Sequence, residues 1–410
     1  MSADTALLSD LVTYLNRGVA PKYVETGGIR VYNQKCIRGQ RVSDGPSRRT
    51  QASARLSQVD KELRLFDVLI NSTGVGTLGR VGQIFGLDEP ATADSHLTIV
   101  RPDPQKIDPL FLGYVLKAYE PEIERLGEGS TGQTELSRAK LGELEINLIS
   151  RDAQKSASAF LYAIDKRLNL LRRISEDIDV FARTLFREWF GAGNSEDWPT
   201  ARLDQHLTAH RGLSYKGAGL CESGEGVPMH NLNSVYEGGG YKYPGIKYYK
   251  GEFKERHVLK PGDIIVTNTE QGHEHRLIGF PAVVPSIFGD NGIFSQHIYR
   301  IVPLDLSYLG REFIYYLLMA GHVRDQIIGS TNGSTVNMLA ISGLQDSTFS
   351  LPPQDIVEKF TATVRPLWEM AERNEKESRD LIKLRDLLLP MLIAGDLQLK
   401  GSVELLGVLT

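Results

Sequence analysis

The feature that most constrains this sequence is an internal repeat, because motifs of the first half return about 200 positions later. The matched segments are Arg17-Gly18 with Arg211-Gly212, 67–70 with 263–266, 129–131 with 329–331, and Arg183 and Leu185 with Arg385 and Leu387. Repeats of this length indicate two duplicated domains rather than solenoid units of roughly 20–50 residues. A chain duplicated in this way is expected to form a pseudo-two-fold object with two similar but non-identical faces.

Length and composition are typical of a soluble globular protein of two or three domains. The chain has 410 residues, of which 41% are hydrophobic and 24% charged. A net charge of −4 argues mildly against a nucleic-acid partner. However, residues 17–64 hold eleven Lys/Arg against four Asp/Glu, and residues 241–260 hold six against two. Such local basic patches favour nucleic-acid binding, while the alternative is that they are ordinary solvated loops.

The cysteines and the hydropathy pattern exclude several classes of protein. Cys36 and Cys221 do not occupy matching repeat positions, so a disulfide framework or a zinc site is not expected. The start of the chain lacks a basic segment followed by an apolar run, so no signal peptide is expected. The most apolar stretches, 313–320 and 387–394, are too short to span a bilayer. We therefore expect a cytoplasmic protein without membrane contact.

The distribution of turn residues and apolar periodicity predicts an α+β fold with four parts. We expect a first domain at 1–150, a long helix at 151–193, a second domain at 194–351, and a second long helix with a tail at 352–410. The strands expected from β-rich runs are 29–32, 68–71, 97–100, 264–267 and 298–302. Shorter helices are expected at 110–120 and 311–320.

Two long amphipathic stripes predict the helices that separate the domains. Apolar residues recur at steps of three and four over 152–190 and again over 354–394, which gives each helix a length of roughly 60 Å. We expect the two stripes to pair antiparallel in a coiled-coil-like spacer; the alternative is that each packs on its own domain. Asn374 falls on the second stripe, where it either sets the register of the pair or faces solvent. Pro366 is expected to kink this helix or to mark its first firm turn.

The search for catalytic motifs predicts a protein without an active site of its own. Gly74, Gly76 and Gly79 resemble a dinucleotide-binding fingerprint, but no clean helix follows them and the repeat counterpart lacks the pattern. His273 and His275 are spaced for a metal pair, but no third ligand is evident, so no metal is expected. No phosphate-binding loop and no amine-methylation motif is present in the sequence.

Polar loop segments at corresponding places in the two halves are the candidate binding residues. Amide side chains and arginine can pair with base edges, and Lys, Ser and Thr can bind phosphates. The candidates for DNA binding are Asn33, Gln34, Lys35, Arg38, Arg41, Ser72, Thr73, Arg80, Thr131, His230, Asn231, Asn233, Thr269, Gln271, His273, Arg276, Thr331 and Asn332. Their repetition at corresponding places with different side chains suggests one scaffold with two readouts.

Over nearly its whole length the chain resembles the specificity (S) subunit of type I restriction–modification enzymes. The residues that carry this resemblance are 32–37, 67–80, 129–133, 183–190 and 384–392. The resemblance implies two target-recognition domains, each reading one half of a bipartite asymmetric DNA site, with the long helices as the spacer. One departure is 268–272, which keeps only part of the pattern seen at 72–76.

The resemblance also implies partners and cofactors. Two methyltransferase (M) subunits are expected to dock on this chain, and motor/nuclease (R) subunits to join that core. S-adenosylmethionine would bind the M subunits, and ATP with Mg²⁺ the R subunits, so this chain needs no cofactor. Two other functions remain open. One is a fused or stand-alone DNA methyltransferase or restriction enzyme, and the other is a scaffold protein that does not bind DNA.

Overall fold

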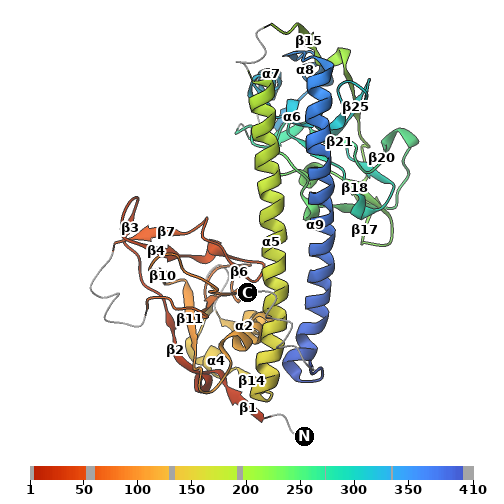
Figure 1. The fold of residues 1–410 in the computed structure, drawn as a ribbon. Coiled ribbons are helices and arrows are strands. Elements are labelled where there is room, and N and C mark those ends of the chain that lie inside the picture. Colours follow the sequence, from red (N-terminus) through yellow and green to blue (C-terminus); the bar gives the residue numbers. More distant parts are fainter. Residues whose placement is uncertain are drawn as a thin grey trace. The chain divides into compact units, whose positions relative to one another are not determined.

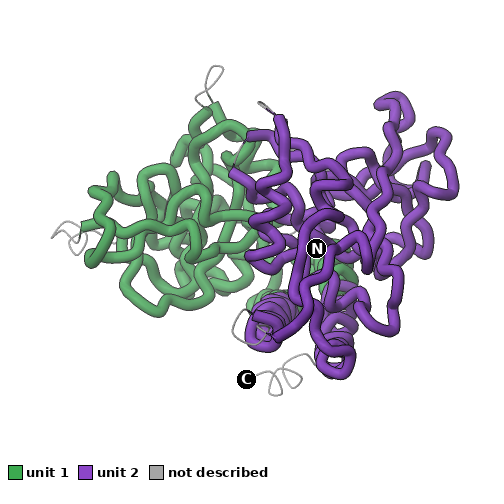
Figure 2. The backbone as a smooth tube through the Cα atoms, turned by 90° about the horizontal axis from the view of Figure 1, so that it is seen from above, with its two compact units in different colours: residues 1–170, 378–410 green, residues 171–377 purple. Residues whose placement is uncertain are grey.

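The computed structural model describes residues 4–51, 61–128, 134–191, 197–272, 274–333 and 336–399. The chain forms two compact units, which Figure 2 distinguishes by colour. Unit 1 contains residues 1–170 and 378–410, and unit 2 contains residues 171–377. Each unit therefore includes one part of each long helix.

Unit 1 is a mixed α and β structure built on two four-stranded sheets. Its strands are β1 (Asp4–Leu7), β2 (Val12–Arg17), β3 (Tyr23–Val24), β4 (Ile29–Tyr32), β5 (Ile37–Arg38), β6 (Arg41–Val42), β7 (Arg48–Thr50), β8 (Val68–Asn71), β9 (Val81–Gln83), β10 (Ala91–Ala93), β11 (Leu97–Pro102), β12 (Gly127–Glu128), β13 (Glu135–Leu136) and β14 (Glu145–Leu148). Its shorter helices are η1 (Leu8–Leu11), η2 (Gln34–Cys36), α2 (Pro109–Ala118), α3 (Glu120–Arg125) and α4 (Arg138–Gly142). The sheets have the strand orders β2-β11-β8-β9 and β10-β4-β7-β3.

Unit 2 repeats this architecture. Its strands are β15 (Thr200–Arg202), β16 (Leu207–Arg211), β17 (Leu220–Cys221), β18 (Val227–His230), β19 (Lys247–Tyr249), β20 (Val258–Leu259), β21 (Ile264–Thr267), β22 (Thr269–Gln271), β23 (Pro281–Val283), β24 (Gly292–Phe294), β25 (Ile298–Pro303), β26 (Val336–Met338) and β27 (Thr348–Ser350). Its shorter helices are η4 (Leu203–Gln205), η5 (Gly217–Gly219), η6 (Leu232–Ser234), η7 (Tyr243–Gly245), η8 (Glu255–His257), η9 (Ser286–Phe288), α6 (Arg311–Leu317), α7 (Gly321–Gly329) and α8 (Ile341–Gln345). The sheets have the strand orders β16-β25-β21-β23 and β17-β19-β18-β24-β20.

The main sheets of the two units match strand for strand. In unit 1, β11 pairs antiparallel with β2 and β8, and Leu97 lies opposite Asn71. In unit 2, β25 pairs antiparallel with β16 and β21, and Ile298 lies opposite Thr267. The second sheet of each unit also contains one parallel pair, β4 with β10 and β18 with β24. The structure thus contains the duplication that the sequence motifs indicate.

Two matched glycines show why one motif recurs. A Cβ on Gly18 would lie 2.0 Å from the carbonyl oxygen of Ala93, and a Cβ on Gly212 would lie 2.2 Å from that of Ser295. Any larger residue would force these backbone segments apart, because side-chain carbon and carbonyl oxygen cannot approach so closely. The Arg-Gly motif therefore recurs because each sheet brings the chain against the turn that precedes its central strand.

Two long helices, α5 (Arg151–Phe190) and α9 (Gln354–Ala394), are each continuous (Figure 1). In unit 2 they run antiparallel, since Ser175 meets Asn374 while Phe190 packs on Phe360 with ring centroids 5.3 Å apart. In unit 1, Asp165 contacts Arg385 and Ile149 lies against Gly395, which is again an antiparallel arrangement. The prediction of a mixed fold with two paired long helices is confirmed.

The helix pair buries a stripe that differs in part from the predicted one. Asn374 is 9% exposed and donates to Ser175 Oγ at 3.4 Å, so it does not face solvent. Phe181, by contrast, is 52% exposed, because the buried stripe of α5 passes through Ala182 and Phe186 instead. Pro366 lies well inside α9 and does not mark its first turn.

Three buried or nearly buried charges join the helices to the recognition fold of unit 1. Asp165 on α5 accepts hydrogen bonds from Tyr114 Oη at 2.9 Å, Lys117 Nζ at 3.3 Å and Arg385 Nη1 at 3.2 Å. Lys117 is 3% and Asp165 6% exposed. We call these four residues the polar node. It links α2, α5 and α9 through a single carboxylate.

The two shorter helices predicted from the sequence end earlier than expected. The helix expected at 110–120 divides at Tyr119 into α2 and α3, because Pro121 lacks the N–H that would continue the first helix. The helix expected at 311–320 ends at Leu317, and Ala320 takes an extended conformation before α7 begins. In both places a second short helix follows the first, and apolar periodicity alone does not show where the first helix ends.

Candidate nucleic-acid interface

Three side chains gather where β8 ends in unit 1, and we call them the first strand-end cluster: Gln34, Thr73 and His96. The amide nitrogen of Gln34 donates to Thr73 Oγ1 at 2.6 Å and also bonds to the Thr73 carbonyl. Thr73 Oγ1 in turn lies 2.8 Å from His96 Nδ1. The His96 side chain is exposed, whereas Gln34 and Thr73 are half-buried. A chain of hydrogen bonds therefore leads from the interior to an exposed imidazole.

Buried neighbours hold this cluster in place. Asn71 is fully buried and donates from Nδ2 to the Gln34 carbonyl at 3.4 Å. Ser72 is also fully buried, and its hydroxyl lies 2.5 Å from Thr98 Oγ1. Ser72 was among the predicted DNA-binding residues, and this is a correction: its hydroxyl is turned into the sheet and cannot reach a ligand at the surface.

A second strand-end cluster, formed by Thr269, Gln296 and His297, lies at the corresponding place in unit 2. Thr269 Oγ1 lies 3.3 Å from His297 Nδ1, and Gln296 Nε2 lies 3.4 Å from His297 Nε2. Thr269 is 5% exposed, so it acts as an anchor and its prediction as a surface contact is wrong. Gln296 is exposed and His297 half-exposed. The two clusters thus share a threonine–histidine pair and differ in the amide beside it.

Two of the four asparagines predicted to bind DNA, Asn33 and Asn231, instead close short turns. Asn33 accepts from the Lys35 amide at 2.8 Å and donates to the Pro46 carbonyl at 2.8 Å. Asn231 accepts from the Asn233 amide at 2.9 Å and donates to the Gly245 carbonyl at 2.8 Å. Because Asn231 is 5% exposed, it is removed from the candidate set. The Asn33 side-chain amide already bonds to the backbone of its own turn. Their match between the repeats is structural.

His230 is also a correction. It is 1% exposed, and its Nδ1 lies 2.8 Å from Tyr241 Oη. Burial lowers the pKa of His230 to about 4, because the charged imidazole would lose its hydration. A neutral and buried ring of this kind belongs to the aromatic packing with Tyr241 and Phe288. It offers nothing to a phosphate or base at the surface.

The remaining predicted residues vary in exposure. Exposed positions are Lys35, Arg38, Asn233, Gln271, Arg276 and Asn332, and half-exposed ones are Arg41, Arg80 and Thr331. Arg276 forms an ion pair with Glu274 at 3.0 Å, and Thr331 donates to the Ile328 carbonyl at 2.8 Å. Thr131 and His273 lie outside the described residues.

Some exposed candidates of unit 2 lie in one small sheet. Asn332 exchanges backbone hydrogen bonds with Met338, at 3.0 and 2.8 Å. Met338 pairs with Thr269, and Gln271 pairs with Val336 on the same two strands, β22 and β26. The Asn332 loop and Gln271 therefore flank the second strand-end cluster.

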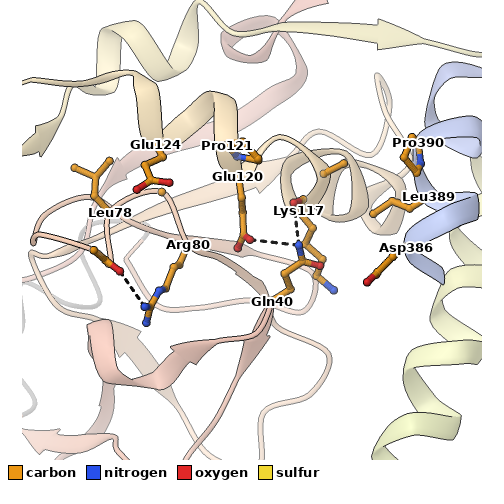
Figure 3. A pocket seen from close by; sticks show the side chains of 13 residues that line it. Gln40, Leu78, Arg80, Lys117, Glu120, Pro121, Glu124, Asp386, Leu389 and Pro390 are labelled. Atoms are coloured by element: carbon orange, nitrogen blue, oxygen red, sulfur yellow. Dashed lines mark hydrogen bonds between the residues drawn. The ribbon is translucent and has the colours of Figure 1, made fainter. Parts of the chain in front are cut away.

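A hollow of about 410 Å³ lies in unit 1 and is lined by residues of the 76–80 turn, α2, α3 and α9 (Figure 3). On its wall Gln40 Nε2 donates to Glu120 Oε2 at 3.3 Å, and Arg80 donates to the Gly76 carbonyl at 2.9 Å. Its wall also carries the carboxylates of Glu124 and Asp386. Three carboxylates beside the half-exposed Arg80 and the buried Lys117 disfavour a phosphate ligand there.

Across the described ranges, no group of three His, Cys, Asp or Glu side chains is arranged to hold a metal ion. In the same part of the chain, no helix has the length and apolarity needed to cross a membrane.

Comparison with known proteins identifies the recognition fold. Residues 9–179 match the family described as the type I restriction modification DNA specificity domain. The chain is 25% identical over 311 residues to the type I restriction enzyme MjaIX specificity subunit of Methanocaldococcus jannaschii, covering 71% of this chain and 69% of the relative. The crystal structure of the type I restriction–modification system S subunit from M. genitalium matches with a TM-score of 0.61 and 18% identity, covering 95% of each chain. The resemblance inferred from the sequence is thus confirmed.

Sequence reasoning missed His96, Gln296 and His297. The signal was present, since Ser95-His96-Leu97 and Gln296-His297-Ile298 each precede the central strand of a main sheet. Matching the repeats on those strands, rather than on the segments before them, places the two histidines at the same position.

Proposed function

We propose that this chain is the DNA-reading specificity subunit of a type I restriction–modification complex. It would recognise a bipartite asymmetric duplex site, with one half read by the fold of each unit. The observation that carries this proposal is the duplicated strand-end cluster, which has a shared pair and a variable amide. One scaffold used twice with different neighbouring side chains suits a site with two unlike halves.

The long helices support a spacer role. α5 and α9 contain 40 and 41 residues, and they contact each other in each unit. We propose that the helix pair sets the number of base pairs between the half-sites. Inserting four residues after Arg173, with four more after Lys376 on the paired helix, lengthens the pair by about 6 Å. Selection from random duplexes should then return the same half-sites with a longer gap; an unchanged gap would contradict the spacer role.

Docking of methyltransferase subunits is supported by an apolar stripe on α9. Leu384, Leu387 and Met391 follow helical spacing and are 41, 66 and 40% exposed. Exposed apolar residues that share a helix face are typical of a protein–protein interface. We propose that two methyltransferase subunits bind this chain and recruit the motor/nuclease subunits. Leu387→Glu should abolish co-purification of the methyltransferase, while Asp386→Lys, at an exposed position on another face of the helix, should not.

The chain is proposed to be non-catalytic, with S-adenosylmethionine and ATP bound by its partners. The test incubates the purified chain with labelled S-adenosylmethionine and duplex DNA, with and without the methyltransferase subunit. Methyl transfer should require the second polypeptide. Transfer by this chain alone would favour the stand-alone enzyme, and binding to partners without any sequence selection would favour the scaffold.

A further inference from the structure

Comparing the two repeats separates residues that read the DNA sequence from residues that position the protein on the DNA backbone. The two halves of an asymmetric DNA site differ in their bases but share the same phosphate backbone. Side chains that bind phosphates can therefore be identical in both repeats, whereas side chains that read bases must differ. The threonine–histidine pair is the part of the strand-end clusters that both repeats keep.

The position of the pair is the same in both sheets. Thr73 stands two residues beyond the last residue of β8, and Thr269 two residues beyond the last residue of β21. His96 and His297 each directly precede β11 and β25, the strands paired with those two. The two threonine–histidine pairs therefore match in their positions in the fold as well as in residue type.

The hydrogen bonds of the first cluster fix the orientation of the imidazole. Gln34 Nε2 donates to Thr73 Oγ1, so the Thr73 hydroxyl can pass its own hydrogen to His96 Nδ1. With the hydroxyl as donor to Nδ1, the imidazole takes the tautomer in which Nε2 carries the proton. Among the described residues none is bonded to that Nε2, and the side chain is exposed. His96 thus presents a single oriented N–H donor at the surface.

The second cluster presents an N–H donor by a different arrangement. Gln296 Nε2 lies 3.4 Å from His297 Nε2. The amide nitrogen can only donate, so Gln296 gives one N–H to a ring Nε2 that carries no proton and keeps its second N–H. Gln296, held by His297, therefore supplies the donor beside the position that His96 occupies in unit 1.

We propose that His96 and the Gln296–His297 pair bind backbone phosphates, one in each DNA half-site, and that Gln34 is a positioning residue for His96 rather than a reader of bases. This inference rests on the proposed DNA-reading function. It reassigns Gln34, whose amide is occupied by Thr73 and is not available to pair with adenine. Base reading is left to the exposed side chains that differ between the repeats, among them Lys35 and Arg38.

The test measures affinity and sequence preference together, on the full chain with its methyltransferase subunits. A selection from random duplexes gives the preferred site of the wild type, and fluorescence anisotropy gives the affinity for that site and for a scrambled duplex. His96→Ala should weaken binding to both duplexes by about tenfold, as expected for one hydrogen bond to a charged acceptor. Its selected sequence should remain that of the wild type.

Two further variants test the chain of hydrogen bonds. Thr73→Val removes the hydroxyl that orients the ring and should weaken binding in the same uniform way. His96→Gln restores an N–H donor at the surface and should recover part of the lost affinity. An unchanged thermal midpoint of the His96 variants would show that the exposed substitution leaves the fold intact.

His210→Ala is the matched control. His210 is also exposed and bonded to a threonine, since its Nε2 lies 3.2 Å from Thr208 Oγ1, but the repeat counterpart is Asn16. Its loss should leave affinity unchanged. The inference is overturned if His96→Ala changes the preferred bases of one half-site, if it leaves affinity unchanged, or if His210→Ala weakens binding as much. If the wild type selects no sequence at all, the proposed function itself fails.

Discussion

The polar node of unit 1 permits a stability prediction worked from the structure. Asp165 is the only carboxylate among the four residues of the node, and it faces Lys117 and Arg385 at 3.3 and 3.2 Å. Asp165→Asn keeps the shape of the side chain and an acceptor for Tyr114. It removes the negative charge and leaves two cations facing each other in a buried place.

The size of the effect follows from burial. Removing one partner of a buried ion pair costs about 3–5 kcal/mol, because the remaining charge stays desolvated without compensation. Lys117 is 3% exposed, so we expect a loss of about 3 kcal/mol. For a unit of this size that corresponds to a fall in the melting midpoint of roughly 6–12 °C.

The dependence on pH gives this prediction a second readout. Burial lowers the pKa of Lys117, and the Asp165 charge opposes that shift only in part. At Asp165, burial raises the pKa, but the charges of Lys117 and Arg385 outweigh it and lower the pKa overall. Without Asp165, the pKa of Lys117 falls further. The unfolded chain then binds more protons than the folded one as pH rises from neutral toward the ordinary Lys value, so the deficit of the variant should shrink over that range.

The measurement is thermal unfolding followed by circular dichroism at two pH values. Asp386→Asn is the matched control, because Asp386 also contacts Arg385 at 2.9 Å but its side chain is 58% exposed. An exposed pair of this kind contributes about 0–1 kcal/mol. Lys117→Met added to Asp165→Asn should recover part of the loss. Equal midpoints for the Asp165 and Asp386 variants, or a deficit that grows with pH, would refute the reasoning.

Three further predictions concern packing, register and specificity. Gly212→Ala should destabilise the protein by about 1–3 kcal/mol in a denaturant titration, whereas Gly217→Ala, with open space around it, should be nearly neutral. Asn374→Leu should raise the melting midpoint, since it replaces a weak 3.4 Å hydrogen bond by apolar contact; a fall would show that Asn374 stabilises the helix pair. Arg38→Ala should relax the preferred bases in one half-site only, at a cost of about 1–3 kcal/mol in binding, and equal weakening on all duplexes would mark it as a phosphate contact.

The elements with a clear period could be predicted from the sequence. The strands at 29–32, 68–71 and 264–267 and the helix at 354–394 have the predicted bounds, and the helix expected at 151–193 begins at Arg151 and ends at Phe190. Each carries an uninterrupted apolar pattern that only one secondary structure can bury. The break at Tyr119 was missed because the apolar pattern continues across it, while the proline that ends the first helix acts two residues later.

The candidate site was harder to predict because side-chain partners lie far apart in the sequence. Gln34 and Thr73 are 39 positions apart, and Thr73 and His96 are 23 apart. Polar residue type identified the right loops, but the same types also cap turns and satisfy buried backbone, as Asn231 and Ser72 do. Only the tertiary hydrogen bonds separate an anchor from a surface donor.

The polar node also bears on how a duplicated chain avoids pairing its like halves. Arg183 is the repeat counterpart of Arg385, yet it pairs with Asp179 on its own helix rather than with a partner helix. Where unit 1 has Tyr114 bonded to Asp165, unit 2 has Tyr316 accepting from Trp368 Nε1 at 2.9 Å. Exchanging the two ends of α9 would therefore take Arg385 away from Asp165 and leave Lys117 as its one remaining cation in the node. The node thus favours one arrangement of the helix ends over the other, because only that arrangement keeps the Asp165–Arg385 ion pair.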